Sequence, residues 1–420
     1  MEGPSLHLKA AATCQSLASL GPRPPIMESP AIESCIRKNE DLFAAERLGC
    51  HPDNQVRIET GGPPIKRQPY RLPLTRKKAL DEKIDNLLDQ GVIVPSSSPW
   101  ASPVVLVEKK DPTEGPRFCI DFTALNKVTE KCVYPIPLIR DIFDQLQGAT
   151  IFSTLDLKSG FHQLPIHRED QEKTAFVCHS GQFNWTRLPM GLSNASSFFQ
   201  RAMEIVFKGL IGTVCMLYID DSVCYSRSEA EHARHVQLLF DRLRQFNLRL
   251  NPAKCVFGLK QVKLLGYIVS QEGLKADPDK VTTILKMVSP ANLPEVVSSL
   301  GMANYYRTCM PDFALTVETL VKLTRKNARF HWSPQHQKAF DSLKTALASE
   351  QVMAHPQPQK EYLLFTDACD YAVGAILCQM DDAGIERPTC YLSEQLSQVQ
   401  RRWATTEKEA YAVVYALKHL

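Results

Sequence analysis

The stretch "TVCMLYIDDSVCYS", residues 213–226, places two adjacent acids, Asp220 and Asp221, between two apolar, β-prone runs. Such a pattern predicts a strand, a tight turn at the acids and a second strand. Two neighbouring carboxylates at a hairpin tip repel each other unless positive charge compensates them, and a divalent metal ion is the usual solution. The alternative for this stretch alone is a polar turn without a ligand.

The composition of the 420 residues is that of an ordinary globular protein, with 44% hydrophobic and 23% charged residues and a net charge of +3. The length allows roughly two to four domains. The 13 cysteines form no C-x-x-C pair, which argues against a zinc module and favours free thiols in a reducing compartment. No apolar run is long enough to span a bilayer, and the N-terminus lacks the features of a signal peptide. We therefore expect an intracellular protein, in the cytoplasm or nucleus, that is not secreted and binds no membrane.

Ahead of the acidic stretch, residues 1–50 show no clear periodicity, and we expect a loose segment with one short helix around "IESCIRKNEDLFAA". A Pro-rich, basic arm follows at 51–74. Next comes a helix that ends at Gly91, with Leu80, Ile84, Leu87 and Leu88 on one face. "SPVVLVEKK" and "PRFCIDF" predict a hairpin that carries Lys109 and Arg117. Before any motif is considered, a solvated charged turn is the simpler interpretation of these two cations.

Around the acidic stretch, "TIFSTLDLKSGFHQLPI" predicts a β-rich segment with a single acid, Asp156. "NASSFFQRAMEIVFKGL" predicts a helix capped by Asn194. In "EAEHARHVQLLFDRLRQFN" the buried stripe should be Val236, Leu239, Phe240 and Leu243. His232 and His235 lie three positions apart on this helix; we favour a solvated face over a metal-binding pair.

Asp156 and the Asp220–Asp221 pair stand on separate β-rich segments. If these strands are neighbours, three carboxylates converge on one sheet, with basic residues nearby from the 109–117 hairpin and Lys254. Hard oxygen ligands that leave coordination positions open suit two-metal phosphoryl transfer. Spacing alone does not establish this chemistry, because Asp is common in turns.

Ten stretches, in order, resemble the reverse transcriptase of gypsy-type LTR retrotransposons and their retroviral relatives, over roughly residues 35–420. They are "GVIVPSSSPWASPVVLVEKKD", "RFCIDFTALNKVT", "YPIPLIRDIF", "FSTLDLKSGFHQLPI", "KTAF", "LPMGLSNASSFFQ", "YIDD", "LNPAKCVFG", "LGYIVSQEGLKADPDKV" and "LGMANYYR". The resemblance implies an RNA-directed DNA polymerase that joins a dNTP to a primer 3′-hydroxyl.

This resemblance also implies roles for single residues. Asp156 and Asp220 would be the principal ligands of two Mg²⁺ ions, Asp221 the third carboxylate, and Lys254 a proton donor to pyrophosphate. The residues that would contact the nucleotide are Lys109 and Arg117 at the triphosphate, Phe161 under the sugar, and Met190 with Gly191 beside nucleotide and template. The residues that would hold the primer end are Leu265, Gly266 and Tyr267. Ordinary core packing is the alternative for Phe161 and Tyr267.

Three positions depart from the family pattern: Thr123 stands where Arg is normal, Ser196 where Pro is usual, and Ser222 where an apolar residue is expected. None of these changes removes a carboxylate. Together they indicate relaxed constraint on the sequence and motivate the second hypothesis given below.

The C-terminal segment resembles the start of the RNase H domain linked to these polymerases. "FTDACDYAVGAIL" and "ATTEKEAYAVVYALKH" would supply Asp367 and Glu409 as metal ligands. A purely structural alternative for Glu409 is a T-x-x-E capping box with Thr406. Because the family's further acids would follow Leu420, we expect a truncated domain with an incomplete metal site. The sequence shows no D-[ST]-G protease motif, no integrase zinc pattern and no phosphate-binding P-loop.

We therefore predict an α+β fold: a right-hand polymerase with fingers, palm and thumb, a helical connection, and a truncated RNase H-like α/β unit. The expected divisions are a loose segment or polyprotein linker (1–50), fingers and palm (51–270), thumb and connection helices (271–355) and the partial RNase H-like domain (356–420). The expected partners are dNTPs and an RNA or DNA template with its primer, bound through basic tracks at 66–78 and 242–263. Solvated surface is the alternative for these tracks. A second hypothesis is a catalytically weak or inactive nucleic-acid-binding relic of a retroelement, and a third makes RNase H the main activity.

Overall fold

The computed structural model describes residues 29–43, 48–52, 55–107, 116–326, 328–348 and 352–420. The chain divides into two compact units. Unit 1 comprises residues 1–145 and 151–259, and unit 2 comprises residues 146–150 and 260–420. The expected domain boundaries at residues 50, 270 and 355 stay predictions.

A four-stranded sheet with the order β7-β8-β4-β9 forms the centre of unit 1. Its strands are antiparallel to their neighbours: β4 (Ile151–Leu155), β7 (Cys215–Tyr218), β8 (Asp221–Ser226) and β9 (Val256–Leu259). Helices α5 (Ile139–Gln145) and α6 (Ala195–Val206) pack on β7, and α7 (Glu229–Gln245) packs on β8 and β4. The predicted stripe of α7 is confirmed, because Val236, Leu239, Phe240 and Leu243 are all buried.

A second sheet of unit 1 has the order β1-β6-β5-β2-β3. Its strands are β1 (Ile93–Pro95), β2 (Ser102–Val107), β3 (Arg117–Ile120), β5 (Phe176–Cys178) and β6 (Gly181–Trp185). The predicted hairpin around residues 108–116 is confirmed by the antiparallel pairing of β2 with β3. Helix α3 (Leu74–Asp89) buries Leu80, Ile84 and Leu87 against the core, as the periodicity predicts, and the fourth residue of the predicted face, Leu88, is partly buried there. Helix α4 (Thr123–Val128) follows β3.

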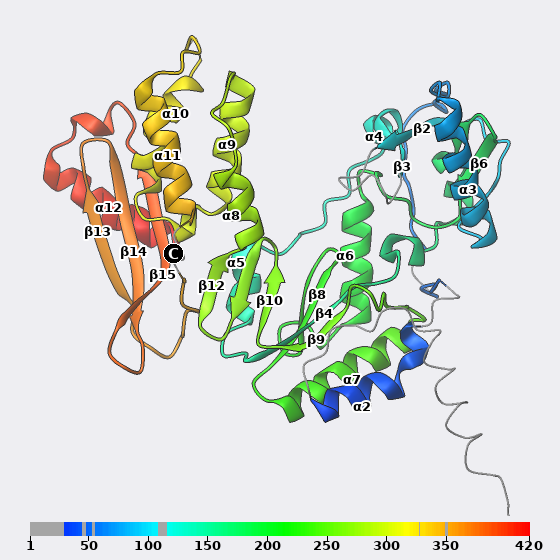
Figure 1. Cartoon of the computed structure of the whole chain (residues 1–420), viewed down its shortest axis with the longest axis horizontal. Coiled ribbons are helices and arrows are strands. Elements are labelled where there is room, and N and C mark those ends of the chain that lie inside the picture. Colours follow the sequence, from blue (N-terminus) through cyan, green and yellow to red (C-terminus); the bar gives the residue numbers. More distant parts are fainter. Residues whose placement is uncertain (1–28, 44–47, 53–54, 108–115, 327, 349–351) are drawn as a thin grey trace, which may run out of the picture. The chain divides into compact units, whose positions relative to one another are not determined.

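The N-terminal part of the described chain packs against α7. Helix α2 (Pro30–Lys38) is the short helix expected there, and the 3₁₀ turn η1 (Glu40–Phe43) follows it. Figure 1 shows α2 and α7 side by side. The ring of Phe43 makes edge contacts with Phe240 and Phe257, at centroid distances of 5.7 and 6.1 Å. Such aromatic pairs add to the apolar area that they bury.

Unit 2 begins with an antiparallel sheet of β10 (Gln261–Leu264), β11 (Tyr267–Ser270) and β12 (Gly273–Ala276). Four helices follow: α8 (Pro278–Leu285), α9 (Leu293–Tyr305), α10 (Phe313–Leu323) and α11 (Pro334–Ala348). At the Asp-Pro start of α8, the Asp277 side chain accepts a hydrogen bond from the Asp279 backbone N–H. Helix α11 likewise begins at Pro334, directly after Ser333.

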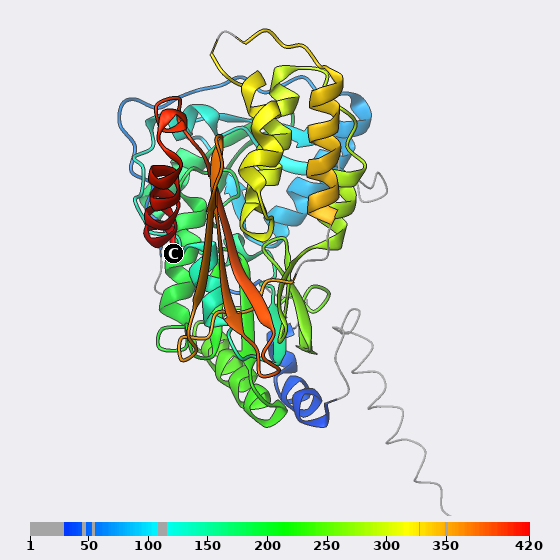
Figure 2. The same ribbon diagram turned by 90° about the vertical axis from the view of Figure 1, so that its left-hand side faces the viewer.

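The last part of unit 2 is an antiparallel sheet of β13 (Leu363–Ala368), β14 (Ala372–Met380) and β15 (Glu386–Gln395), followed by α12 (Thr405–His419). Figure 2 shows α12 beside the sheet. Val373, Ala375, Leu392, Ala412 and Ala416 form the buried layer between helix and strands.

Candidate active site

The predicted acidic hairpin is present at the end of the central sheet of unit 1. Tyr218 pairs with Asp221, so Ile219 and Asp220 form a two-residue connection between β7 and β8. The backbone φ of Ile219 is +53°, a left-handed conformation that is unusual for a β-branched residue. Two-residue hairpins favour this positive φ because its twist matches that of the strands. The turn thereby places both acids at the exposed tip of the hairpin.

A buried glutamine from α6 holds this turn. The side-chain Oε1 of Gln200 accepts the backbone N–H of Ile219 at 2.6 Å, and its Nε2 donates to Glu204 Oε1 at 2.8 Å. The other carboxylate oxygen of Glu204 accepts the hydroxyl of Tyr134. Gln200 is 1% exposed, so the position of its amide is fixed by packing as well as by hydrogen bonds. Sequence reasoning missed this residue, although a glutamine within the apolar stripe of a helix was a usable signal.

Asp156 lies immediately after β4, the strand next to β8. Leu155 pairs with Ser222, which brings Asp156 to the same end of the sheet as the acidic hairpin. Its backbone oxygen accepts the N–H of Asn251 at 2.8 Å, and its Oδ2 lies 3.4 Å from Lys254 Nζ. The sequence predicted the convergence of the three acids and Lys254, but not the contact with Asn251.

The electrostatics of this sheet end disfavour negative charge. Loss of hydration and the charges of Asp221 and Asp156 raise the pKa of Asp220 to about 6, although Lys254 opposes the shift. Loss of hydration also raises the pKa of Asp221, with the charge of Asp156 adding to it. For Asp156, the same loss raises the pKa against the effect of Lys254. The side chains of Asp220 and Asp221 still reach solvent, so a cation from solution could relieve the repulsion.

These carboxylates fit a divalent ion by their donor chemistry, because hard oxygen ligands are those that Mg²⁺ prefers. Within the described ranges, no three His, Cys, Asp or Glu side chains are already gathered into a ready metal-binding group. The acids therefore converge on one end of the sheet without forming a closed cage.

The residues predicted to contact a nucleotide are placed as follows. Lys109 lies outside the described residues. Arg117 is exposed at the start of β3 and pairs with Val107. Phe161 is buried against the ring of Phe199, at a centroid distance of 4.9 Å. Met190 is 63% exposed, and Gly191 has a φ of +94°.

The three positions that depart from the family pattern are accommodated locally. The N–H of Thr123 donates to Asp121 Oδ1 at 3.1 Å at the start of α4. Ser222 is 8% exposed within the β7-β8-β4 ladder. Ser196 lies in the first turn of α6.

Asn194 precedes helix α6, but its side chain does not cap the helix. The side-chain oxygen of Asn194 accepts the Cys132 N–H, and its amide group donates to the backbone oxygen of Glu130. The predicted side-chain cap is therefore wrong.

We predicted that His232 and His235 lie on a solvated face of α7, and this prediction is wrong. His232 is fully buried, with Nε2 2.6 Å from Ser153 Oγ and Nδ1 3.0 Å from Ser226 Oγ. Burial lowers the pKa of His232 to about 4. His235 is partly buried, and its Nδ1 lies 2.8 Å from Ser226 Oγ. His232 lies one helical turn before Val236 and thus extends the buried stripe of α7. The hydroxyls of Ser153 and Ser226 provide hydrogen-bond partners for its two ring nitrogens.

In unit 2, Leu265 and Gly266 form the connection between β10 and β11, and Tyr267 is the first residue of β11. Asp367 lies on β13 opposite Gly374, and Glu409 lies on α12, which packs along β13. The structural alternative, a capping box of Thr406 and Glu409, is wrong. Helix α12 begins at Thr405, and the Glu407 carboxylate accepts the Ala404 N–H at 2.9 Å.

The two predicted basic tracks differ in whether their cations are paired with carboxylates. Residues 66–71 are exposed. In the 242–263 track, Arg244 is paired with Asp41 at 2.7 Å, and Lys263 forms ion pairs with Asp277 and Asp279. Part of the second track is thus neutralised by neighbouring carboxylates.

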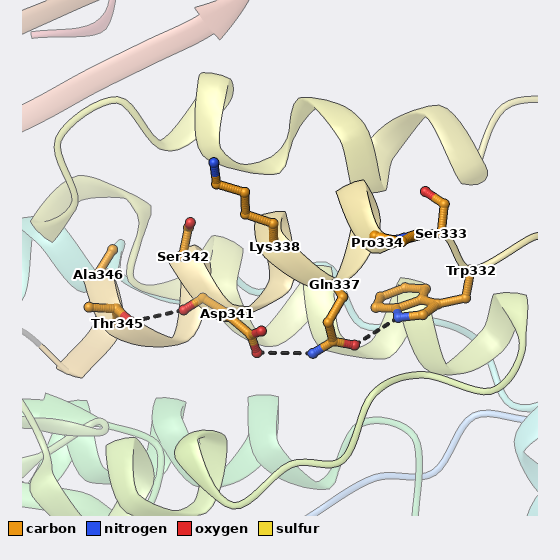
Figure 3. A pocket seen from close by; sticks show the side chains of 9 residues that line it. All are labelled: Trp332, Ser333, Pro334, Gln337, Lys338, Asp341, Ser342, Thr345 and Ala346. Carbon is orange, nitrogen blue, oxygen red and sulfur yellow. Dashed lines mark hydrogen bonds between the residues drawn. The ribbon is translucent and has the colours of Figure 1, made fainter.

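A hollow of about 960 Å³ lies on α11, lined by residues between Trp332 and Ala346 (Figure 3). Its polar groups bond one another: Trp332 donates to Gln337 at 2.9 Å, and Gln337 donates to Asp341 at 3.0 Å. None of the predicted site residues lines it.

In the described part of the chain, no helix has the length and apolar character needed to cross a membrane.

Comparison with known proteins agrees with this geometry. Residues 107–269 match the family described as reverse transcriptase (RNA-dependent DNA polymerase), and residues 332–420 match the RNase H-like domain found in reverse transcriptases. The retrovirus-related Pol polyprotein from transposon opus of Drosophila melanogaster is 38% identical over 380 residues, which cover 87% of this chain and 38% of that protein. The transposon Tf2-3 polyprotein of Schizosaccharomyces pombe is 32% identical, covering 98% of this chain and 31% of its own length.

Solved structures give the same fold. The foamy viral protease-reverse transcriptase solved with double-stranded DNA matches with a TM-score of 0.84 and 21% identity, covering all of this chain and 74% of that one. A second structure of that enzyme with double-stranded DNA matches with a TM-score of 0.83. The predicted α+β fold, a right-hand polymerase with an RNase H-like unit, is confirmed.

The class defined by fold and site is therefore that of the reverse transcriptases. The chain belongs to the reverse transcriptases of retrovirus-like transposons and carries their RNase H-like domain. Both kinds of domain generally depend on divalent metal ions. The chain spans about a third of the length of the curated relatives it matches.

Proposed function

We propose that this chain performs RNA-directed DNA synthesis, joining dNTPs to the 3′-hydroxyl of a primer on an RNA or DNA template. The observation that carries the proposal is the meeting of Asp156, Asp220 and Asp221 at one end of the β7-β8-β4-β9 sheet, within the reverse transcriptase domain. Their raised pKa values mark a place where negative charge is destabilised until a cation arrives. That is the electrostatic setting that metal-assisted phosphoryl transfer requires.

Asp156 and Asp220 would hold two Mg²⁺ ions, with Asp221 contributing less directly. When bound, the ions would activate the primer hydroxyl and neutralise charge on the triphosphate. Lys254, beside Asp156, would give a proton to the leaving pyrophosphate. Lys109 and Arg117 would hold the triphosphate, since guanidinium and ammonium groups stabilise its charge.

The remaining roles concern selection and placement of the substrate. Phe161 would lie under the sugar and exclude a 2′-hydroxyl, which selects dNTPs; its fixed position against Phe199 suits a steric filter. Met190 and Gly191 would line the nucleotide and template, and Leu265, Gly266 and Tyr267 would hold the primer end. The exposed Met190 side chain is available for such a contact.

The nucleic-acid partner would be a primer–template duplex. The foamy viral protease-reverse transcriptase, which has a similar fold, was solved in complex with double-stranded DNA and with an RNA/DNA hybrid. In this chain the exposed arm of residues 66–71 and the cations of α3 would contribute contacts with phosphate groups, which makes binding salt-sensitive. We expect this activity in the cytoplasm or nucleus.

Asp367 and Glu409 would be the first two ligands of an RNase H metal site. They come from β13 and α12, which pack together in unit 2. A site of this kind needs further acids, and no group of three or more such ligands is present among the described residues.

Primer extension on poly(rA)–oligo(dT) with Mg²⁺ tests the polymerase proposal. The parent chain should extend the primer, and Asp220→Asn should not. Asp85→Asn, an exposed acid of α3, is the matched control and should behave as the parent does. No extension by the parent would reject the function and favour the inactive relic, and equal extension by Asp220→Asn would reject the assigned site. If hybrid cleavage by this chain survives Asp367→Asn, the RNase H assignment is wrong.

A further inference from the structure

The turn between β10 and β11 has a backbone conformation that its sequence alone does not favour. Leu265 and Gly266 have φ values of +49° and +77°, so both residues are left-handed. Glycine adopts this conformation freely, whereas a leucine side chain crowds its own carbonyl there. Contacts from outside the turn must therefore hold Leu265 in place.

Those contacts come from two consecutive tyrosines at the end of α9, in the stretch "LGMANYYR". The hydroxyl of Tyr305 donates to the backbone oxygen of Leu265, and the hydroxyl of Tyr306 donates to the backbone oxygen of Gly266 at 3.0 Å. The Asp277 N–H also donates to Gly266 O, at 3.0 Å. Each carbonyl of the two-residue turn is thus held by a side chain distant in sequence.

The contact is reciprocal. The hydroxyl of Tyr267, the first residue after the turn, donates to the backbone oxygen of Tyr305 at 2.9 Å. The three rings pack together, with centroid separations of 5.1 to 5.5 Å. Tyr267 and Tyr306 are 5% and 4% exposed, which limits the access of water to their side chains, whereas Tyr305 is 40% exposed. Burial raises the pKa of Tyr306 to about 12, so its phenol keeps the proton that it donates.

The fit leaves little room for change in the turn itself. A Cβ atom on Gly266 would lie 3.1 Å from the Tyr306 hydroxyl oxygen, closer than ordinary carbon–oxygen contact. The glycine therefore satisfies both the positive φ and the close approach of the phenol. Turn and tyrosines form one fitted structure.

We propose that Tyr305 and Tyr306 are positioning residues for primer extension. Their hydroxyls fix the backbone of the Leu265–Gly266 turn, so that the hairpin presents the primer end in one place. This inference rests on the proposed function, which assigns residues 265–267 to the primer. It gives a role to Tyr305 and Tyr306, which otherwise appear only within "LGMANYYR", one of the stretches that resemble reverse transcriptases. The effect is on geometry: small displacements of a reacting end are costly for the rate.

The test uses Tyr305→Phe, Tyr306→Phe and the double variant of the full chain, because phenylalanine keeps the ring and removes only the hydroxyl. Two measurements are made: hydrogen exchange of the amides in residues 261–270, and primer extension over a range of dNTP concentrations up to saturation. Thermal unfolding checks that each variant folds. Tyr362→Phe is the control, since Tyr362 is 44% exposed and its hydroxyl has no hydrogen-bond partner in the described part of the chain.

We expect faster exchange in the hairpin of the double variant, and a rate of extension lowered by about 10-fold to 100-fold with little change in KM for dNTP. The single variants should lie between parent and double variant. Unchanged exchange would show that the hydroxyls do not hold the turn, whatever the activity. Faster exchange with extension equal to that of Tyr362→Phe would show that the turn does not position the primer. If the parent itself does not extend, the proposed function fails and the positioning role falls with it.

Discussion

The ammonium group of Lys254 lies 3.4 Å from the carboxylate of Asp156, although the two residues are 98 positions apart in the sequence. Their side chains are 65% and 34% exposed, so water screens the pair. Exposed ion pairs of this kind add little to stability, commonly less than about 1 kcal/mol. The pair therefore contributes little to folding, and the role proposed for it is in the chemistry at the sheet end.

We therefore predict that Lys254→Met changes the free energy of unfolding by less than about 1 kcal/mol. Primer extension in a single turnover should be slowed by about 100-fold, the usual size of a proton-transfer contribution. Lys208→Met removes an exposed lysine of the same unit and should have neither effect. An unchanged rate for Lys254→Met would remove the proton-donor role from this residue.

A second prediction concerns Gln200, whose amide holds the turn before Asp220. Gln200→Leu leaves the Ile219 N–H without its 2.6 Å partner and should lower the free energy of unfolding by about 1–3 kcal/mol. Because Ile219 is in a left-handed conformation, loss of the bond should also free the turn, seen as faster hydrogen exchange at Ile219 and slower extension. Gln245→Leu, at the exposed end of α7, is the control. If exchange at Ile219 does not change, Gln200 is merely a packed residue.

A third prediction concerns pH and the buried His232. Its pKa is about 4 in the folded protein and about 6.5 when unfolded, so the unfolded state binds the proton more readily. The stability that this histidine gives is complete above about pH 6.5 and declines as the pH falls toward about 4, by an amount on the order of 3 kcal/mol. Urea unfolding measures it.

The variant His232→Gln isolates this contribution. It should be less stable than the parent at pH 7.5, because Ser153 and Ser226 lose their ring partner. Since the variant does not titrate there, the difference should shrink toward pH 4.5. His331→Gln, an exposed histidine, should follow the parent at both pH values. A difference that grows on acidification would contradict the buried neutral ring.

A fourth prediction compares two glycines of unit 2. Gly273 has a φ of +138°, and a Cβ there would overlap the carbonyl oxygen of Met353 and lie 2.8 Å from its carbonyl carbon. Gly273→Ala should cost roughly 2–4 kcal/mol of stability, measured by urea unfolding. Gly301 lies within α9, and its Cβ would meet no atom within 4 Å. Gly301→Ala should instead be neutral or stabilise by about 0.5–1 kcal/mol. Equal effects of the two substitutions on stability would mean that the backbone around β12 shifts to make room for the added methyl group at little cost.

Local patterns predicted most of what positions the site. The alternation around Asp220, the single acid after β4 and the stripe of α7 each follow from short-range periodicity, and the structure contains them. The errors arose where partners come from afar. His232 is hydrogen-bonded to serines of neighbouring strands, and Gln200 accepts the Ile219 N–H. These partners could not be identified without knowing which strands are neighbours.

The start of α12 shows a different limit. The run "ATTEKE" contains a single T-x-x-E match, Thr406 with Glu409, and this pair is not the one that caps the helix. Backbone geometry selects Ala404 and Glu407, with Ala404 supplying its N–H and no side-chain oxygen. The cap therefore depends on where the preceding chain arrives, which the local sequence does not encode.

The packing of residues 30–43 on α7 has a practical consequence for the choice of fragment boundaries. Leu42 and Phe43 are 0% and 3% exposed, and Asn39 donates to Gln237 at 2.9 Å. A fragment designed from the family match alone would begin near residue 107 and would discard this layer. The faces of Phe240 and Phe257 would then be open to water, an apolar patch that promotes association. A soluble minimal polymerase should therefore begin upstream of Pro30.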